Sequence, residues 1–343
     1  MRQIFQKNRL YPVILIIVVF AVWKFRQGDK DAEKVSFQGM TMGTYYNIIY
    51  LDHDGVSYQE KIDSLLDIWN MALSTYIPGS EISRFNRDTV HKFKLPYFYP
   101  VLVASRNVYN VSNGAFDPTI MPLVNAWGFG PVESELPESN IIDSLMQYIG
   151  FDNIRFNETS VHKPDIGIQL DFSAIAKGYG VDVVGDFLEN LEIENYLVEI
   201  GGEISCKGVN DRGVPWTTGV EDPTGEYLER KIMTVIGIDN KSIATSGNYR
   251  NFYVKDGKKY AHTISPFTGF PVQHSLLSAS VITDDCMYAD AYATAFMVLG
   301  LEKSKEILKA QDDLDAYLIY ADENGELKTF ITEGVRSTII EQN

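Results

Sequence analysis

The order of helical and extended segments constrains the fold of this chain more than any other feature of its sequence. Helical periodicity follows a Ser57/Glu60 capping box and recurs at about 100–112, at 141–149, after Asp171, at 289–299 and at 302–310. Extended runs are predicted at 196–200, 231–238, 252–254, 278–282 and in a final hairpin, 316–320 with 327–331. Because helices and strands do not alternate one for one, a doubly wound parallel sheet is disfavoured. The predicted class is α+β.

Charge and cysteine content exclude several classes of protein. The chain has 30 basic against 46 acidic residues and a formal net charge of −16. Binding to a phosphate backbone needs clustered Lys and Arg, so a nucleic-acid protein is disfavoured. The two cysteines, Cys206 and Cys286, lie in unrelated contexts and form no CxxC pair, which argues against zinc and dithiol chemistry. We interpret them as two buried free thiols.

The N-terminus is typical of a membrane-targeting segment. Three basic residues, Arg2, Lys7 and Arg9, precede an apolar run over 10–23. That run is short for a transmembrane helix of about 20 residues and matches a signal-peptide core in length. No small-x-small cleavage site follows it, so we favour an uncleaved signal anchor over a cleaved peptide. Positive charge ahead of the run places the N-terminus in the cytoplasm and the body outside.

These features divide the chain into three parts. Residues 1–27 are the expected anchor, 28–36 read as a polar linker, and 37–343 form the globular part. With 343 residues, 45% of them hydrophobic, the chain can bury one large core or two moderate ones.

Asp290 and Thr294 form the most informative local pair. They lie four residues apart in an apolar helical segment, so their side chains share one helix face. A buried carboxylate is costly unless it is paired or binds a metal, and carboxylate and hydroxyl oxygens suit Mg²⁺ with phosphate. The plainer interpretation is that Asp290 caps the helix and Thr294 bonds its own backbone.

The segment 170–180 combines a helix start with a cation and two glycines. Asp171 or Ser173 is expected to cap the following helix, whose free N–H groups would form an anion site beside Lys177. Gly178 and Gly180 cost helix stability, which indicates close approach of a ligand or another backbone. An ordinary capped helix with a surface lysine is the alternative.

Three further segments carry candidate residues. The 114–119 and 122–130 stretches are rich in Pro and Gly, and their exposed Phe and Trp side chains would cover a planar ring unless they form a packed loop core. The 244–250 stretch is expected to be a Ser-Gly turn with hydroxyls and an arginine. His262 precedes a Pro-Gly loop and is a candidate for proton transfer, although a lone histidine is more often structural.

Taken in order, these segments resemble the ApbE family. The blocks that carry the resemblance are 42–44, 74–76, 80–86, 114–118, 127–130, 171–178, 200–204, 244–250, 262–269 and 289–294. The match covers about 39–300, most of the chain, with every block in family order.

The resemblance implies a T-fold-like α+β architecture with antiparallel sheets and an FAD site between its two halves. It implies a metal site formed by Asp290, Thr294 and the backbone carbonyl of Ala174. The implied cofactor-binding residues, including Ser246 of the 244–250 block, are Met42, Tyr76, Ala115, Phe116, Asp117, Asp171, Lys177, Ser246, His262 and Ile264.

The implied activity is Mg²⁺-dependent transfer of FMN from FAD to a Thr or Ser hydroxyl of an acceptor protein, with release of AMP. The implied acceptors are flavoprotein subunits of membrane redox complexes, of the Na⁺-translocating NADH:quinone reductase or a related type, with catalysis in the bacterial periplasm at the inner membrane. His262 and Asp290 are the catalytic candidates. Two other activities stay open, hydrolysis of FAD to FMN and AMP and non-enzymatic FAD binding.

Two features depart from the family pattern. Many members are lipoproteins, whereas this chain has the expected anchor helix. Some members carry a second acid just before the metal-binding threonine, where this chain has Ala293. Fewer carboxylates would weaken Mg²⁺ binding without cofactor or hold one ion in place of two.

Overall fold

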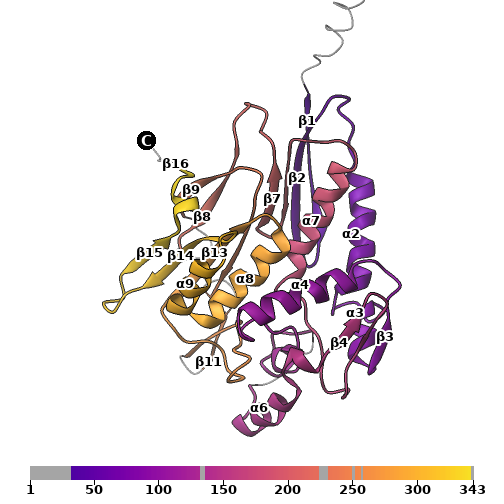
Figure 1. The fold of residues 1–343 in the computed structure, drawn as a ribbon, viewed down its shortest axis with the longest axis vertical. Coiled ribbons are helices and arrows are strands. Elements are labelled where there is room, and N and C mark those ends of the chain that lie inside the picture. Colours follow the sequence, from indigo (N-terminus) through magenta and orange to yellow (C-terminus); the bar gives the residue numbers. More distant parts are fainter. Residues whose placement is uncertain (1–31, 132–135, 224–230, 249–251, 256–257, 341–343) are drawn as a thin grey trace, which may run out of the picture.

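The computed structural model describes residues 32–131, 136–223, 231–248, 252–255 and 258–340 (Figure 1). Within those ranges no helix is long and apolar enough to cross a membrane. The anchor expected at 1–27 lies outside the described residues, so it stays a prediction.

An eight-stranded sheet forms the centre of the molecule, and each neighbouring pair of its strands is antiparallel. In spatial order its strands are β1 (Glu33–Thr41), β2 (Thr44–Asp52), β6 (Tyr196–Ile200), β7 (Glu203–Lys207), β10 (Ser242–Gly247), β13 (Leu276–Thr283), β14 (Asp315–Ala321) and β15 (Leu327–Ile331). The expected antiparallel α+β class is confirmed.

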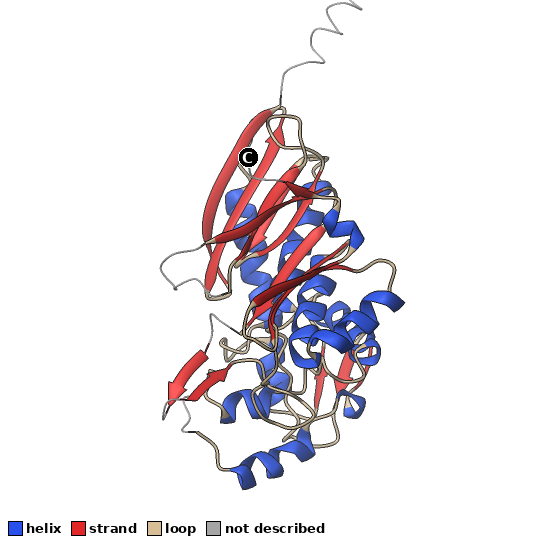
Figure 2. Ribbon diagram, turned by 90° about the vertical axis from the view of Figure 1, so that its left-hand side faces the viewer, coloured by secondary structure: helices blue, strands red, loops and turns tan. Residues whose placement is uncertain are grey.

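Helices cover one face of this sheet and a smaller sheet covers the other (Figures 1 and 2). The main helices are α2 (Gln59–Leu73), α4 (Phe98–Val111), α7 (Ala176–Glu189), α8 (Cys286–Leu299) and α9 (Leu301–Ala310). The smaller sheet has the order β16 (Ile339–Ile340), β9 (Ile232–Ile238) and β8 (Trp216–Glu221).

The remaining elements lie around this core. A three-stranded sheet contains β3 (Val90–Lys92), β5 (Ser160–His162) and β4 (Arg155–Asn157), and β11 (Phe252–Lys255) pairs with β12 (Lys258–Ala261). The short helices are α3 (Glu81–Asn86), α5 (Met121–Ala126), α6 (Ser139–Leu145), α10 (Glu333–Arg336) and two 3₁₀ turns, η2 (Met146–Tyr148) and η3 (Phe151–Asn153).

Strand β14 shows how both faces of the sheet are buried. Ala316 and Leu318 pack into the helical layer, whereas Tyr317 and Ile319 pack against the small sheet. A strand with two buried faces carries apolar residues almost continuously, since successive side chains point to opposite faces. The apolar run in β14 is therefore part of the core and not an exposed edge.

Several expectations about single elements were wrong in detail. Helix α2 begins at Gln59 without a side-chain cap, so the Ser57/Glu60 capping box does not form. Strands β1 and β2 were not predicted, and β1 begins at Glu33, inside the expected linker. The hairpin β14–β15 does not end the fold, because α10 and β16 follow it. Both cysteines are buried and free, as predicted.

Candidate functional site

A cavity opens where strand β10 extends beyond the turn of the β6–β7 hairpin. That turn consists of Gly201 and Gly202, whose φ angles of 66° and 107° favour glycine. Strand β10 pairs with β7 only at Ser242 and Ile243 but continues to Gly247 along β13. A cavity lies beside the part of β10 that does not pair with β7. Its volume is about 760 Å³, within the range of about 300–1,000 Å³ for ligand sites.

Nearly all of the candidate site residues line this one cavity. They are Tyr76, Ala115, Phe116, Asp117, Asp171, Ala174, Lys177, Ser246, His262, Ile264, Asp290 and Thr294. Met42 does not line it; its side chain packs against the core beside Gly180.

Helices α7 and α8 form one wall of the cavity and are joined by two direct contacts. The Asp182 carboxylate of α7 accepts hydrogen bonds from the backbone N–H groups of Cys286 and Met287, each at 2.8 Å. These are free donors of the first turn of α8, so Asp182 caps that helix from outside. Gly178 lies where the helices approach most closely, because a Cβ there would overlap the carbonyl oxygen of Cys286 and lie 2.9 Å from Asp290 Cβ.

Replacing Gly178 with alanine should therefore destabilise the protein, although alanine normally favours a helix by about 1 kcal/mol. The added methyl must push the two helix backbones apart, and overpacking of this kind costs about 1–3 kcal/mol. The midpoint and slope of urea unfolding report this loss.

Gly180→Ala in the same helix is the matched control. The new methyl there meets the flexible end of the Met42 side chain, so we expect a change below about 1 kcal/mol. A Gly178→Ala protein as stable as the parent would contradict the close approach of the helices.

Asp290 is buried, with 2% of its surface exposed, and lies inside α8. Its Oδ2 accepts the backbone N–H of Gly178 at 3.1 Å and lies 3.7 Å from Lys177 Nζ. Among the described residues no hydrogen bond reaches Oδ1. Asp290 therefore does not cap its own helix, which excludes the plainer interpretation of this residue.

The Thr294 hydroxyl lies 3.1 Å from the hydroxyl of Ser246 on β10. Thr294 therefore contacts a neighbouring strand. This contact excludes the interpretation that its hydroxyl bonds only to the backbone of its own helix. Ser246 lies within β10, so the predicted Ser-Gly turn was wrong; Arg250 of that segment lies outside the described residues.

The oxygen atoms near Asp290 that could ligate a metal suit Mg²⁺ better than zinc. A free carboxylate oxygen and two hydroxyls are hard ligands, and Ala174 lines the same cavity. No group of three or more His, Cys, Asp or Glu side chains that could hold a metal occurs in the part of the chain that the structure describes. Such a site suits Mg²⁺ that takes its remaining ligands from phosphate and water.

Lys177 lies between two buried carboxylates. Its Nζ is 3.2 Å from Glu203 Oε1 and 3.7 Å from Asp290 Oδ2, so it is not an ordinary surface lysine. Although burial opposes the charged amine, Asp290 and Glu203 together raise the pKa of Lys177 above its usual value. Burial raises the pKa of Glu203 to about 8, with Lys177 opposing the shift and Asp290 adding to it.

Asp171 shapes its own segment and does not cap α7. It accepts hydrogen bonds from the N–H of Ser173 at 2.8 Å and from the hydroxyl of Ser173 at 2.5 Å. Helix α7 begins later, at Ala176, with no side-chain cap, so the predicted cap at Asp171 or Ser173 was wrong. Burial raises the pKa of the Asp171 carboxyl.

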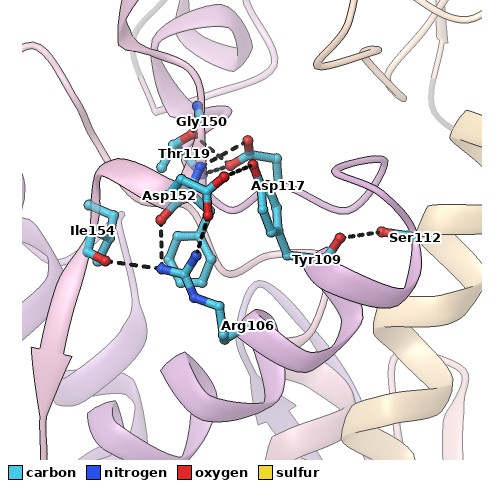
Figure 3. Close-up of polar contacts among 9 residues, drawn as sticks. Arg106, Tyr109, Ser112, Asp117, Thr119, Gly150, Asp152 and Ile154 are labelled. Atoms are coloured by element: carbon cyan, nitrogen blue, oxygen red, sulfur yellow. Dashed lines mark hydrogen bonds and ion pairs between the residues drawn. The ribbon is translucent and has the colours of Figure 1, made fainter.

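Both oxygens of Asp117 accept hydrogen bonds from the chain (Figure 3). Thr119 donates its N–H at 2.8 Å and its hydroxyl at 2.6 Å, and Phe151 donates its N–H at 3.2 Å. Arg106 holds the same turn from α4, donating to the carbonyl of Phe151 at 2.7 Å and pairing with Asp152 at 3.0 Å. Asp117 therefore fixes the loop at the cavity floor through this network.

The aromatic residues of the loops differ in exposure. Tyr76 is 67% exposed at the cavity, whereas Phe116 and Trp127 are buried at 2% and 5%. The Trp127 indole donates to the carbonyl of Gly269 at 2.8 Å. The expectation of exposed Phe and Trp was therefore wrong for these two residues: Phe116 packs into the large helical core and Trp127 into a small separate apolar cluster. Phe129 is partly exposed and lines the cavity.

His262 is half-buried at the cavity, with its ring edge-on to Phe129 at a centroid distance of 6.5 Å. The following loop is closed by a bridge between Ile264 and Pro271 and by a hydrogen bond from Val272 N–H to the Thr263 carbonyl at 3.0 Å. These contacts hold the loop that directly follows His262, and His262 itself lines the cavity.

Reasoning from the sequence missed several cavity residues. Glu203 is buried and paired with Lys177, and Glu199 and Tyr45 also line the cavity. The signal for Glu203 was its place directly after the Gly201-Gly202 pair, because a tight turn fixes the first residue of the next strand.

Comparison with known proteins shows a consistent similarity. Residues 42–318 match the model of the ApbE family. The chain is 37% identical to the FAD:protein FMN transferase of Haemophilus influenzae, over 90% of this chain and 93% of that protein. It is 39% identical to the protein of the same name from Vibrio cholerae, over 82% and 86% of the two chains.

Solved structures agree with these sequence similarities. The flavin transferase ApbE from Vibrio cholerae superimposes with a TM-score of 0.79 at 36% identity, covering 90% of this chain and 99% of that one. The apo flavinyl transferase ApbE of Pseudomonas stutzeri superimposes with a TM-score of 0.80 at 30% identity, covering 90% and 97%. The overall fold is thus shared with flavin transferases.

Proposed function

The chain belongs to the ApbE family, and from that premise we propose that it is an FAD:protein FMN transferase. It would transfer FMN from FAD to a Thr or Ser hydroxyl of an acceptor protein and release AMP. One observation carries the proposal: a single cavity brings the free carboxylate oxygen of Asp290 and the hydroxyl of Thr294 together with Lys177 and aromatic loop residues. Such a cavity can hold a pyrophosphate and a planar ring together.

The residues present define where Mg²⁺ would be held. Asp290, Thr294 and the carbonyl of Ala174 are its proposed ligands, and their oxygens fit a hard cation. Bound there, Mg²⁺ would neutralise charge on the pyrophosphate oxygens of FAD. Lys177 would add a fixed positive charge on the same side of the cavity.

In the proposed reaction an acceptor hydroxyl attacks the FMN-side phosphorus of FAD. The new O–P bond forms as the pyrophosphate bond breaks, and the AMP phosphate leaves with the electron pair. His262 would take the hydroxyl proton. The loop segments beside Phe116 and Tyr76 would hold the flavin ring and limit access of water.

The test is incubation of the full chain with FAD, Mg²⁺ and a Thr-containing acceptor peptide, read by intact mass and by AMP release. FMN transfer predicts a peptide that gains FMN, with one AMP released for each peptide modified. Release of FMN and AMP at the same rate without the peptide would indicate a hydrolase, and FAD binding without AMP release would indicate a binding protein.

The N-terminal anchor, the periplasmic position of the body and its T-fold-like architecture belong to the same proposal. They are supported by the basic residues Arg2, Lys7 and Arg9 ahead of the apolar run and by the family resemblance. We propose flavoprotein subunits of membrane redox complexes, such as the Na⁺-translocating NADH:quinone reductase, as acceptors. A reporter fused after Asn343 that is active only in the cytoplasm would disprove the topology.

A further inference from the structure

Glu203 is buried in the cavity wall, where it pairs with Lys177. It is the first residue of β7, directly after the Gly201-Gly202 turn, and 4% of it is exposed. Its Oε1 lies 3.2 Å from Lys177 Nζ. Its Oε2 is buried and has no hydrogen-bond partner among the described residues.

The neighbouring lysine creates an electrostatic problem for the proposed metal site. Lys177 Nζ lies 3.7 Å from the Oδ2 oxygen of Asp290, so its charge offsets the charge of that carboxylate. A divalent cation approaching Asp290 would also be repelled by the amine. With Lys177 and Asp290 alone, the wall would carry no net charge to attract Mg²⁺.

We propose that Glu203 is a positioning residue that offsets the charge of Lys177, so that the Asp290 carboxylate can take a divalent cation. This inference rests on the proposed function, which places the metal at Asp290. Glu203 binds no metal itself; it acts through Lys177. With both carboxylates ionised, Lys177, Asp290 and Glu203 together carry one negative charge, which attracts a divalent cation.

Two features of the geometry support this role. Lys177 Nζ lies 3.2 Å from Glu203 Oε1 and 3.7 Å from Asp290 Oδ2, and no hydrogen bond among the described residues reaches Asp290 Oδ1. The lone pairs of Glu203 Oε2 find no donor in the described part of the chain. Lys177 is the cation that the described residues place against Glu203, so pairing of these two leaves the charge of Asp290 for an incoming cation.

The experiment measures binding of Mn²⁺ alone to the full chain, without FAD, by loss of the free-ion EPR signal under anaerobic conditions at pH 8.5. The alkaline pH favours the ionised form of the Glu203 carboxyl, because burial raises its pKa; this group faces Lys177 of α7 and Asp290 and Cys286 of α8. Glu203→Gln keeps an acceptor oxygen for Lys177 but removes the charge. We expect Mn²⁺ affinity to fall about tenfold or more.

Glu199→Gln is the matched control, because Glu199 lines the same cavity from β6 but does not pair with Lys177. The same loss of charge there should change Mn²⁺ affinity by less than about threefold. An equal loss in both variants would overturn a specific role for Glu203.

The double variant Lys177→Met/Glu203→Gln gives the decisive comparison. It removes one positive and one negative charge, so the net charge beside Asp290 returns to that of the parent. We expect Mn²⁺ affinity to recover to within about threefold of the parent. A double variant that binds as weakly as Glu203→Gln would overturn the proposal, as would Glu203→Gln binding that matches the parent.

A further pair of variants separates this inference from the proposed function. Asp290→Asn should abolish Mn²⁺ binding; if it binds like the parent, the metal site itself is misplaced. If Asp290→Asn abolishes binding while Glu203→Gln has no effect, only the role of Glu203 is disproved.

If Glu203→Gln does not fold, Lys177→Met tests the same charge balance. Loss of the amine charge should make this variant bind Mn²⁺ more tightly than the parent. Equal or weaker binding would overturn the proposal.

Discussion

Replacing Asp290 with asparagine is expected to lower the rate of FMN transfer by about 10³-fold or more. The amide cannot supply the carboxylate charge that would hold Mg²⁺, and such an ion contributes several kcal/mol to transition-state stabilisation. Because asparagine has nearly the same shape and keeps an acceptor for the Gly178 N–H, the α7–α8 contact should survive. The measurement is the transfer rate at saturating FAD, with thermal unfolding to confirm the fold.

Asp285→Asn provides the control for this variant. Asp285 precedes the same helix, is exposed and makes no side-chain cap, so the same chemical change there should leave the rate within about twofold. A folded Asp290→Asn protein that transfers FMN normally at low millimolar Mg²⁺ would remove Asp290 from the metal site.

Replacing His262 with alanine should lower FMN transfer by roughly 10²–10⁴-fold, the usual contribution of a general base. FAD affinity should change little, because the proposed pyrophosphate contacts come from α7 and α8. The residual rate should rise with pH, since hydroxide can partly replace the missing base. FAD affinity and the saturated rate are measured on one preparation.

His162→Ala is a suitable control, because His162 is exposed on β5 and lies outside the cavity. If His262→Ala instead binds FAD weakly and reaches the parent's rate at saturation, the histidine only packs against the flavin or holds its loop. That result would end the general-base proposal.

Local pairs of site residues could be predicted from the sequence, whereas contacts between distant segments could not. Asp290 and Thr294 could be paired from their spacing, because helical periodicity fixes which side chains share a face. The cap of α8 could not be predicted, since Asp182 lies 104 residues before the N–H group of Cys286 that it binds. The same limit explains the wrong caps at Ser57 and Asp171, where short-range motifs were assumed to act locally.

Errors about strands have a related cause. Ser246 and Gly247 are common in turns, yet they extend β10, because pairing with Ala279 and Ser278 of β13 outweighs local preference. Glu203 was overlooked as a site residue, since its importance follows from the charges of Lys177 and Asp290 beside it. Met42, which matches a family position, is partly buried and packs against the core; its role in FAD binding stays a prediction.

The two walls of the cavity are held by different kinds of contact. In the α7–α8 wall, the Asp182 carboxylate accepts hydrogen bonds from backbone N–H groups of α8, and Gly178 allows the two helices to approach closely. The opposite loop is held mainly by the Trp127 indole and a small separate apolar cluster with Ile264. A substitution in the loop would therefore shift His262 without disturbing the contacts that hold Asp290 in the α7–α8 wall.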